Sequence, residues 1–164
     1  MAAETPTVHA SAVLAGSRAV LIRGPAGAGK SQLALALLQA ADTGLLRFAR
    51  LVGDDRVHLE ARHGRLLVRP AAALAGLIEV RGLGVRQLEY EPVVVVGLLV
   101  DLAAEDAERI PTASEAVLLD VPVRRLALPP GGAPLAPVLA LLRSPDGDIK
   151  PPSWSLRPRP PVQN

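Results

Sequence analysis

The chain has no cysteine, few aromatic residues and only two lysines among its 164 residues. Without cysteine it can form neither disulfide bonds nor thiolate metal sites. Aromatic side chains make up 2% of the sequence, which leaves little for base stacking on single-stranded nucleic acid. The net charge is only +2 and arginine is spread along the chain, so we expect no nucleic-acid partner.

Long apolar runs are also lacking. The most apolar stretch, Val93–Leu102, is too short to cross a bilayer and includes Asp101. The first residues do not show the basic segment followed by an apolar segment that a signal peptide requires. We therefore expect a cytoplasmic protein with no membrane partner.

Lys30 is the most informative residue, because arginine occupies every other cationic position except Lys150. It lies in Gly24–Ser31, whose sequence GPAGAGKS fits the P-loop pattern G-x-x-x-x-G-K-[ST]. A compact ammonium reaches between nucleotide phosphates where a planar guanidinium fits poorly. Backbone N–H groups of such a loop bind phosphate oxygens. The expected nucleotide-binding residues are Gly24, Ala26, Gly27, Ala28, Gly29, Lys30 and Ser31.

The flanking segments agree with a P-loop. Ala19–Ile22 predicts a buried strand, and the leucine- and alanine-rich segment up to Asp42 predicts a helix. A helix N-terminus favours anions, and the Ser31 hydroxyl is suited to Mg²⁺. The alternative is an ordinary glycine-rich turn between a strand and a helix.

Two adjacent carboxylates, Asp54 and Asp55, follow the short strand Leu51–Val52. Neighbouring carboxylates repel each other unless a cation or a basic group is close. One of them can face a metal ion, while the other accepts a proton from a substrate hydroxyl. The alternative is a solvated turn, for which Gly-Asp-Asp is common chemistry.

A third pattern is EVRGLGV at Glu79–Val85, where Gly82 and Gly84 follow a predicted strand. Paired glycines at this place indicate an unusual backbone path or a close approach. Glu79 and Arg81 are expected on one strand face, where they can serve one site. Taken alone, the pattern favours a structural bend.

The remaining pattern predicts a mostly β protein with one further helix. We expect one domain at residues 1–143, followed by a proline-rich tail at 144–164 that is disordered or extended. The expected elements are a strand at Thr7–Leu14, a hairpin with arms 57–61 and 66–68, strands at 77–80 and 92–102, one or two strands within 117–128, and a helix at 135–142.

Together these motifs resemble the catalytic domain of HPr kinase/phosphorylase, in its short single-domain form. The resemblance covers roughly His9 to Arg143, and Glu-x-Arg-Gly-Leu-Gly is its most specific part. It implies an α/β fold related to phosphoenolpyruvate carboxykinase, with a P-loop helix and a C-terminal helix on a mostly β core. The resemblance rests on His9–Val13, Gly24–Ser31, Val52–Val57, Ile78–Val85 and Asp120–Val123.

The resemblance implies a serine protein kinase that uses ATP and Mg²⁺. Its substrate would be an HPr-type phosphocarrier protein of the sugar phosphotransferase system, so the reaction would regulate carbohydrate metabolism. Members also run the reaction backwards with inorganic phosphate. Long members form hexamers, which leaves a homo-oligomer open for this chain.

The same resemblance implies roles for individual residues. Lys30 and the loop amides would hold the β-phosphate, while Ser31 and Asp55 would hold Mg²⁺. Asp54 would take the serine proton, with His9 near it as a second catalytic residue. Glu79 would serve a second metal position or support the metal ligands. Arg81, Gly82 and Gly84 form the signature loop.

The chain departs from the family in its C-terminal glycine turn at Pro129–Pro134, which contains no arginine. Long members use an arginine there for the reverse reaction, so we expect the reverse reaction to be weak. Arg124 and Arg125 lie on the preceding strand and are the nearest replacements. Two alternatives remain, a nucleotide-binding regulatory module without catalysis and a P-loop kinase with another substrate.

Overall fold

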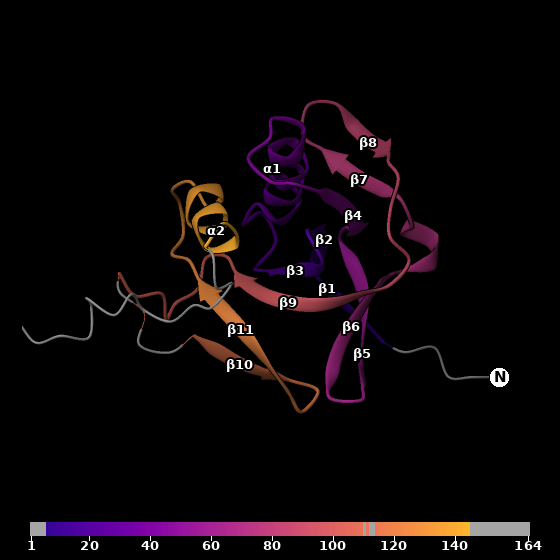
Figure 1. Ribbon diagram of the computed structural model, residues 1–164. Coiled ribbons are helices and arrows are strands. Elements are labelled where there is room, and N and C mark those ends of the chain that lie inside the picture. Colours follow the sequence, from indigo (N-terminus) through magenta and orange to yellow (C-terminus); the bar gives the residue numbers. More distant parts are fainter. Residues whose placement is uncertain (1–5, 110, 112–113, 145–164) are drawn as a thin grey trace, which may run out of the picture.

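The structure is a computed structural model that describes residues 6–109, 111 and 114–144 (Figure 1). Apart from Ser144, the predicted tail lies outside the described residues, as does Trp154. The strands are β1 Thr7–His9, β2 Ser11–Ala15, β3 Arg18–Arg23, β4 Ala49–Gly53, β5 Arg56–Arg62, β6 Arg65–Pro70, β7 Leu77–Val80, β8 Gly84–Gln87, β9 Val94–Asp101, β10 Glu115–Leu118 and β11 Val121–Ala127. The helices are α1 Lys30–Asp42, α2 Leu135–Leu142 and the short 3-10 turn Ala72–Leu74.

Nine strands form one mixed sheet with β9 at its centre. The order is β1-β5-β6-β9-β3-β2-β4, and β11 pairs with both β9 and β10. The β9 strand is parallel to β3 and to β11, whereas the other pairs are antiparallel. The β7–β8 hairpin forms a separate two-stranded sheet. In Figure 1 this hairpin lies beside α1, while the β5–β6 and β10–β11 hairpins extend away from both helices.

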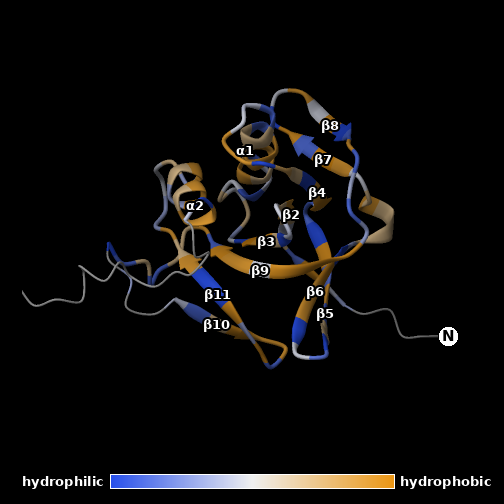
Figure 2. Ribbon diagram, in the orientation of Figure 1, coloured by the Kyte–Doolittle hydropathy of each residue, from blue (hydrophilic) through white to orange (hydrophobic). Residues whose placement is uncertain are grey.

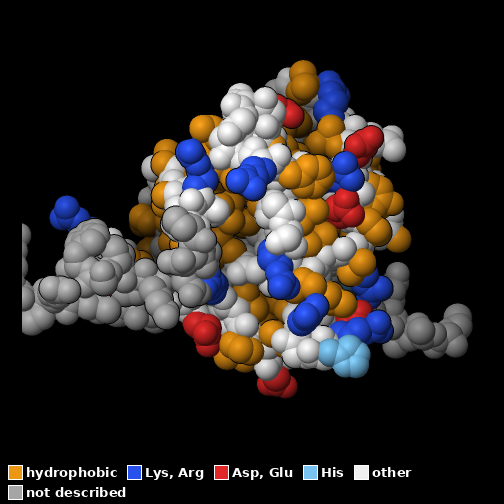
Figure 3. All heavy atoms as spheres, viewed as in Figure 1, with side chains coloured by type: hydrophobic (Ala, Val, Ile, Leu, Met, Phe, Trp, Pro, Cys, Tyr) orange, Lys and Arg blue, Asp and Glu red, His pale blue; other side chains and the backbone are white. Residues whose placement is uncertain are grey.

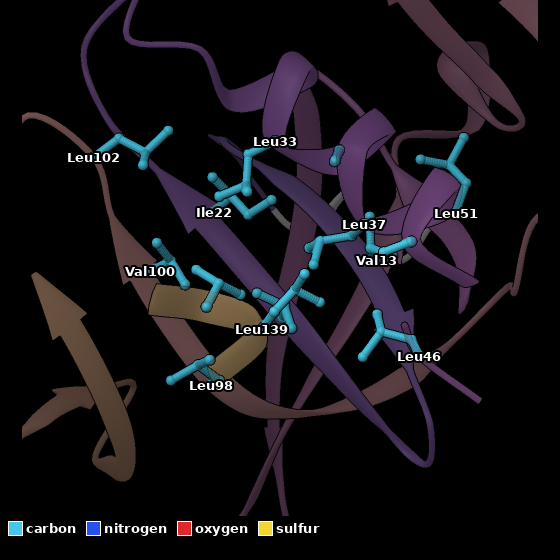
Figure 4. Packing of buried hydrophobic residues seen from close by; sticks show 14 of the residues in the cluster. Val13, Ile22, Leu33, Leu37, Leu46, Leu51, Leu98, Val100, Leu102 and Leu139 are labelled. Carbon is cyan, nitrogen blue, oxygen red and sulfur yellow. The ribbon is translucent and has the colours of Figure 1, made fainter. Parts of the chain in front are cut away.

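Two apolar cores fill the molecule, and the central strands contribute to both. Alternate residues of a strand point to opposite faces, so Val20 and Ile22 enter one core while Ala19 and Leu21 enter the other. The first core joins α1 and α2 to the sheet, and Figure 4 shows Leu33, Leu37 and Leu139 among its members. Hydrophobic residues extend along β9 in Figure 2, as expected for a strand with both faces covered. The cores rigidly anchor the loop between β3 and α1.

The mixed, mostly β fold with two helices agrees with the prediction, and the hairpin predicted at 57–68 is confirmed. The one or two strands expected within 117–128 are two, the paired β10 and β11. The prediction of one strand at Thr7–Leu14 is wrong. The chain changes partners at the fully buried Ala10, so that β1 pairs with β5 whereas β2 pairs with β3 and β4. The Ala10 N–H leaves the strand ladder and donates to the Asp55 carbonyl, at 3.1 Å. Gly82 and Gly84 do not simply end a strand, because the chain turns there and returns as β8.

Candidate functional site

The loop between β3 and α1, whose sequence fits the P-loop pattern, is tightly wound in the structure. Gly27 and Gly29 have backbone φ angles of 81° and 98°, which residues other than glycine rarely adopt. At Gly24 a Cβ atom would come within 3.1 Å of Leu102, so the loop must pass close to the end of β9. The backbone is thereby wound tightly before the first turn of α1. This is the arrangement that presents amide groups to an anion.

The Lys30 side chain folds back over the loop. Its Nζ donates to the carbonyl oxygens of Gly24 at 2.8 Å and Pro25 at 3.1 Å. The residue is only 7% exposed, so these bonds also compensate the ammonium for lost hydration. An ammonium has three donors, which leaves a third for an anion in the loop.

Asp54 is buried and accepts hydrogen bonds from three directions. The Ser31 hydroxyl lies 2.8 and 2.9 Å from its two carboxylate oxygens, and the Ser11 hydroxyl donates at 2.6 Å. The Glu79 backbone N–H donates at 3.2 Å. The carboxylate therefore links the P-loop helix, β2 and β7. Ser11 was missed from the sequence, and its only signal is a hydroxyl in an otherwise apolar strand.

Asp55 differs from Asp54 in exposure and in its hydrogen-bond partner, and its backbone is left-handed. Its side chain is 61% exposed and its backbone is left-handed, with φ of 68°. Its carboxylate lies 2.8 Å from His9 Nε2. The left-handed backbone turns the second carboxylate away from the first, so the repulsion expected between adjacent carboxylates is reduced.

These pairings are the reverse of those expected. Ser31 was expected to share a metal ion with Asp55, but its hydroxyl contacts Asp54. His9 was expected beside Asp54 as the proton acceptor, but it contacts Asp55. The structure therefore associates the buried carboxylate with the P-loop and the exposed one with the histidine.

A cleft of about 270 Å³ brings most of the predicted site residues together. Its lining consists of His9, Ala26, Gly27, Gly29, Lys30, Ser31, Gln32, Asp55, Glu79 and Arg81. Gly82 in the turn after Arg81 and Gly84 at the start of β8 are both exposed and do not line it. Asp54 does not line it either and reaches it through Ser31.

A second, larger cleft of about 830 Å³ lies on the other side of the P-loop. It shares Ala26, Gly27, Gly29 and Gln32 with the first cleft and extends to the segment before α2. In the sequence, that segment had been interpreted only as a turn without arginine. The further lining is Pro25, Ala28, Leu33, Ala36, Leu102, Ala103, Leu128–Leu135 and Pro137.

A third carboxylate near the P-loop, Asp101, is held by arginines. Arg23, which precedes the loop, donates to both of its carboxylate oxygens, at 2.8 and 2.9 Å. Arg125 donates to it at 2.6 Å and also binds Asp106. Burial alone would raise the pKa of Asp101, but the hydrogen bonds from both arginines outweigh it and hold this pKa below its ordinary value. Hydrogen bonds to Asp106 and Asp101 likewise raise the pKa of Arg125.

The donor groups fit Mg²⁺ bound together with a nucleotide. Within residues 6–109, 111 and 114–144, no group of three or more His, Asp or Glu side chains is arranged to hold a metal. Mg²⁺ does not require such a cage, since it is usually held by one or two carboxylates with phosphate oxygens and water. Ser31 and Asp54 supply a hydroxyl and a carboxylate next to the P-loop, and Glu79 lies in the same cleft.

The described part of the chain has no helix long and apolar enough to span a bilayer. Asp55, Lys30 and Arg81 line the smaller cleft, which is open to solvent.

Comparison with known proteins places these features in a family. Residues 1–90 match the family model described as HPr Serine kinase C-terminal domain. An HPr kinase/phosphorylase of Streptococcus thermophilus is 42% identical over 84 residues, covering 51% of this chain and 25% of that protein. One of Clostridium tetani is 30% identical over 122 residues, covering 67% of this chain and 38% of that protein.

A solved structure shares the fold. The HPr(Ser) kinase/phosphatase of Coxiella burnetii superposes with a TM-score of 0.69 at 24% identity, over 85% of this chain and 95% of that one. The chain spans only a quarter to two fifths of the two relatives compared above. Because the family model matches more than half of the chain, the protein belongs to the family of the HPr serine kinase C-terminal domain.

Proposed function

We propose that this chain is an ATP- and Mg²⁺-dependent serine protein kinase that phosphorylates an HPr-type phosphocarrier protein in the cytoplasm. The main support for this proposal is that the two adjacent carboxylates have different hydrogen-bond partners. One carboxylate accepts a hydrogen bond from the P-loop serine and the other contacts a histidine, and the second lines the same cleft as Lys30. Family membership supports this reaction class, and the P-loop supports a relationship to phosphoenolpyruvate carboxykinase.

Binding of the donor nucleotide is assigned to the P-loop. Lys30 and the loop amides hold the β-phosphate, and the larger cleft accommodates the nucleoside. Ser31 and Asp54 would hold Mg²⁺, and Glu79 would serve a second metal position or support these ligands. When bound, the metal neutralises charge on the phosphate oxygens. We thus assign Asp54 to the metal and Asp55 to the proton, because the hydrogen bonds of Ser31 and His9 differ from those expected.

Asp55 acts on the substrate serine. Its exposed carboxylate accepts the hydroxyl proton while the serine oxygen forms a bond to the γ-phosphorus. The bond between that phosphorus and the β–γ bridging oxygen breaks, and ADP leaves. His9 orients Asp55 through their 2.8 Å contact and so keeps it aimed at the acceptor.

We propose that the reverse, phosphate-driven reaction is weak. Two phosphate groups repel, so the reverse reaction needs an additional cation in the cleft. Arg81 lines the cleft, whereas Arg125 is already bound to Asp101 and Asp106. Arg124 lines neither of the two clefts beside the P-loop, and the glycine turn at Pro129–Pro134 contains no arginine.

The test is transfer of label from γ-labelled ATP to HPr-type phosphocarrier proteins of the same organism, with and without Mg²⁺. Phosphoserine on the carrier, dependent on Mg²⁺, is the expected result. Nucleotide binding without transfer to any carrier would instead indicate a regulatory module. Pyrophosphate formation from the phosphorylated carrier and millimolar phosphate, followed in parallel, measures the reverse reaction. A reverse rate equal to the forward rate would contradict the assignment of a weak reverse reaction.

A further inference from the structure

The β5–β6 hairpin has one apolar and one basic face. Val57, Leu59, Leu66 and Val68 point into the second core and are buried. Alternation along both strands places every second residue on the opposite face. The outward set, called here the basic face, consists of Arg56, His58, Glu60, Arg62, Arg65, Leu67 and Arg69. Four arginines and one glutamate leave this face with an excess of three positive charges.

The register of the hairpin places two arginines directly opposite each other next to the turn. Arg62 lies directly opposite Arg65, and Arg69 lies opposite His58. Glu60 contacts Arg62 at 3.2 Å and Arg69 at 3.4 Å, so one carboxylate serves two arginines. Like charges in facing cross-strand positions destabilise a hairpin. The internal packing of the fold therefore does not account for this concentration of arginine.

The basic face is continuous with the catalytic cleft. In the pairing of β1 with β5, His9 lies opposite Arg56, and Arg56 directly follows Asp55. From Arg56 to Arg62 the strand extends about 20 Å, at about 3.3 Å per residue. Figure 3 shows arginine side chains beside a histidine over the far end of this hairpin. A protein whose serine enters the cleft would thus have its adjoining surface over the arginines.

The face also has an apolar centre. Leu67 pairs with Val95 of β9, and both side chains are half-buried. An apolar centre with charged groups around it is the usual composition of a protein interface. The basic face contains no Phe, Tyr or Trp, so it lacks the large stacking platforms of single-stranded nucleic-acid sites.

We propose that the basic face of the β5–β6 hairpin docks an acidic surface of the phosphoacceptor protein beside its target serine. This inference depends on the proposed function, which it extends from the transferred group to the partner's surface. Complementary charge steers encounter and fixes orientation, so that the serine arrives opposite Asp55.

The test compares charge reversal on and off the basic face. Arg62→Glu with Arg65→Glu changes two exposed residues next to the hairpin turn. The matched control, Arg47→Glu with Arg143→Glu, makes the same change of charge at exposed residues outside the hairpin. Arg62→Gln with Arg65→Gln removes the charge without placing new acids beside Glu60. Thermal unfolding of each variant shows whether it is folded.

For the HPr-type phosphocarrier protein as acceptor, we expect the hairpin reversal to raise KM at least 10-fold while kcat and the KM for ATP stay near wild type. The control should change the acceptor KM less than twofold. The difference should shrink between about 0.05 and 1 M salt, since the Debye length falls to about 3 Å. Changing the carrier's acidic residues near its serine to lysine should restore binding to the reversed enzyme.

Equal effects of the two double variants would overturn the proposal, as would tight binding of RNA on this face that competes with the carrier at about 0.15 M salt. Carrier binding is also measured directly, by titration without ATP. If the wild-type chain bound the carrier through the basic face but transferred no phosphate, the proposed kinase activity would fail while the docking surface stood. If the chain transferred phosphate but bound the carrier without the basic face, the kinase activity would stand and the docking surface would fail.

Discussion

Two acidic regions flank the P-loop, and their partners differ. After β4, Asp54 and Asp55 contact hydroxyl groups, a backbone N–H and a histidine. At the end of β9, Asp101 is held by two arginines and is largely neutralised. Both lie at strand ends next to the loop, where a P-loop protein can place its metal-binding acid.

The two regions differ in how much of the carboxylate charge is neutralised by their partners. A carboxylate that already shares its charge with two guanidinium groups is a poor ligand for Mg²⁺ and a poor proton acceptor. Neutral hydroxyl donors orient a carboxylate without neutralising it. The region after β4 is therefore suited to the reaction, whereas Asp101 fixes the ends of β3, β9 and β11 around Arg23.

The largest effect is expected from Lys30→Ala, which should reduce phosphate transfer below detection. The ammonium is the one lysine of the loop, and no neutral residue can stabilise charge on the β- and γ-phosphates. Circular dichroism should show a folded protein, since α1 and both cores are unchanged. Measuring transfer to the carrier tests this, and near-wild-type turnover would remove the P-loop from the mechanism.

Substituting each of the two neighbouring carboxylates separately should give different defects. Asp55→Asn should leave nucleotide binding intact and reduce turnover roughly 10² to 10⁴-fold, because a general base is lost. Asp54→Asn should chiefly weaken Mg²⁺-dependent nucleotide binding. Titration with a fluorescent nucleotide, with and without Mg²⁺, separates the two. The opposite pattern of defects would restore the assignment expected from the family resemblance.

The sequence was sufficient to predict the glycine loop between β3 and α1 and the β5–β6 hairpin. Lys30 in GPAGAGKS and the alternation around Gly64 are local signals, and the structure has the corresponding loop and turn. Glu79 and Arg81, which one motif contains, both line the small cleft, and so does His9 from a distant segment.

Local signals could not decide which carboxylate meets which partner. Asp54 and Asp55 are adjacent in sequence, and only the left-handed backbone at Asp55 separates them in space. The break at Ala10 depends on Asp55 as well, since its carbonyl accepts the Ala10 N–H. The network of Asp101 joins residues up to 78 positions apart, so no short pattern predicts it.

A smaller effect on activity and a clear effect on stability are expected from Asp101→Asn. Removing one charge from a mostly buried ion pair leaves two arginines incompletely paired, which should cost about 3 kcal/mol of unfolding free energy. The exposed Asp106→Asn should cost much less, because solvent screens its ion pair with Arg125. Urea unfolding measures both. At a temperature where the Asp101 variant is folded, its kcat should remain within about threefold of wild type, and a loss as large as that of Asp55→Asn would make Asp101 part of the catalytic machinery.

The smallest effect concerns acid stability. The pKa of folded Asp101 lies below its ordinary value, so its stabilisation is complete above the unfolded pKa of about 3.9 and is lost as pH falls towards the folded pKa. The stability difference between wild type and Asp101→Asn should therefore be constant above about pH 5 and shrink between about pH 4 and pH 2. Urea midpoints across this range measure it, with the exposed Glu105→Gln as control. A difference that stays constant to pH 2 would mean that the arginines stabilise the region without depending on the Asp101 charge.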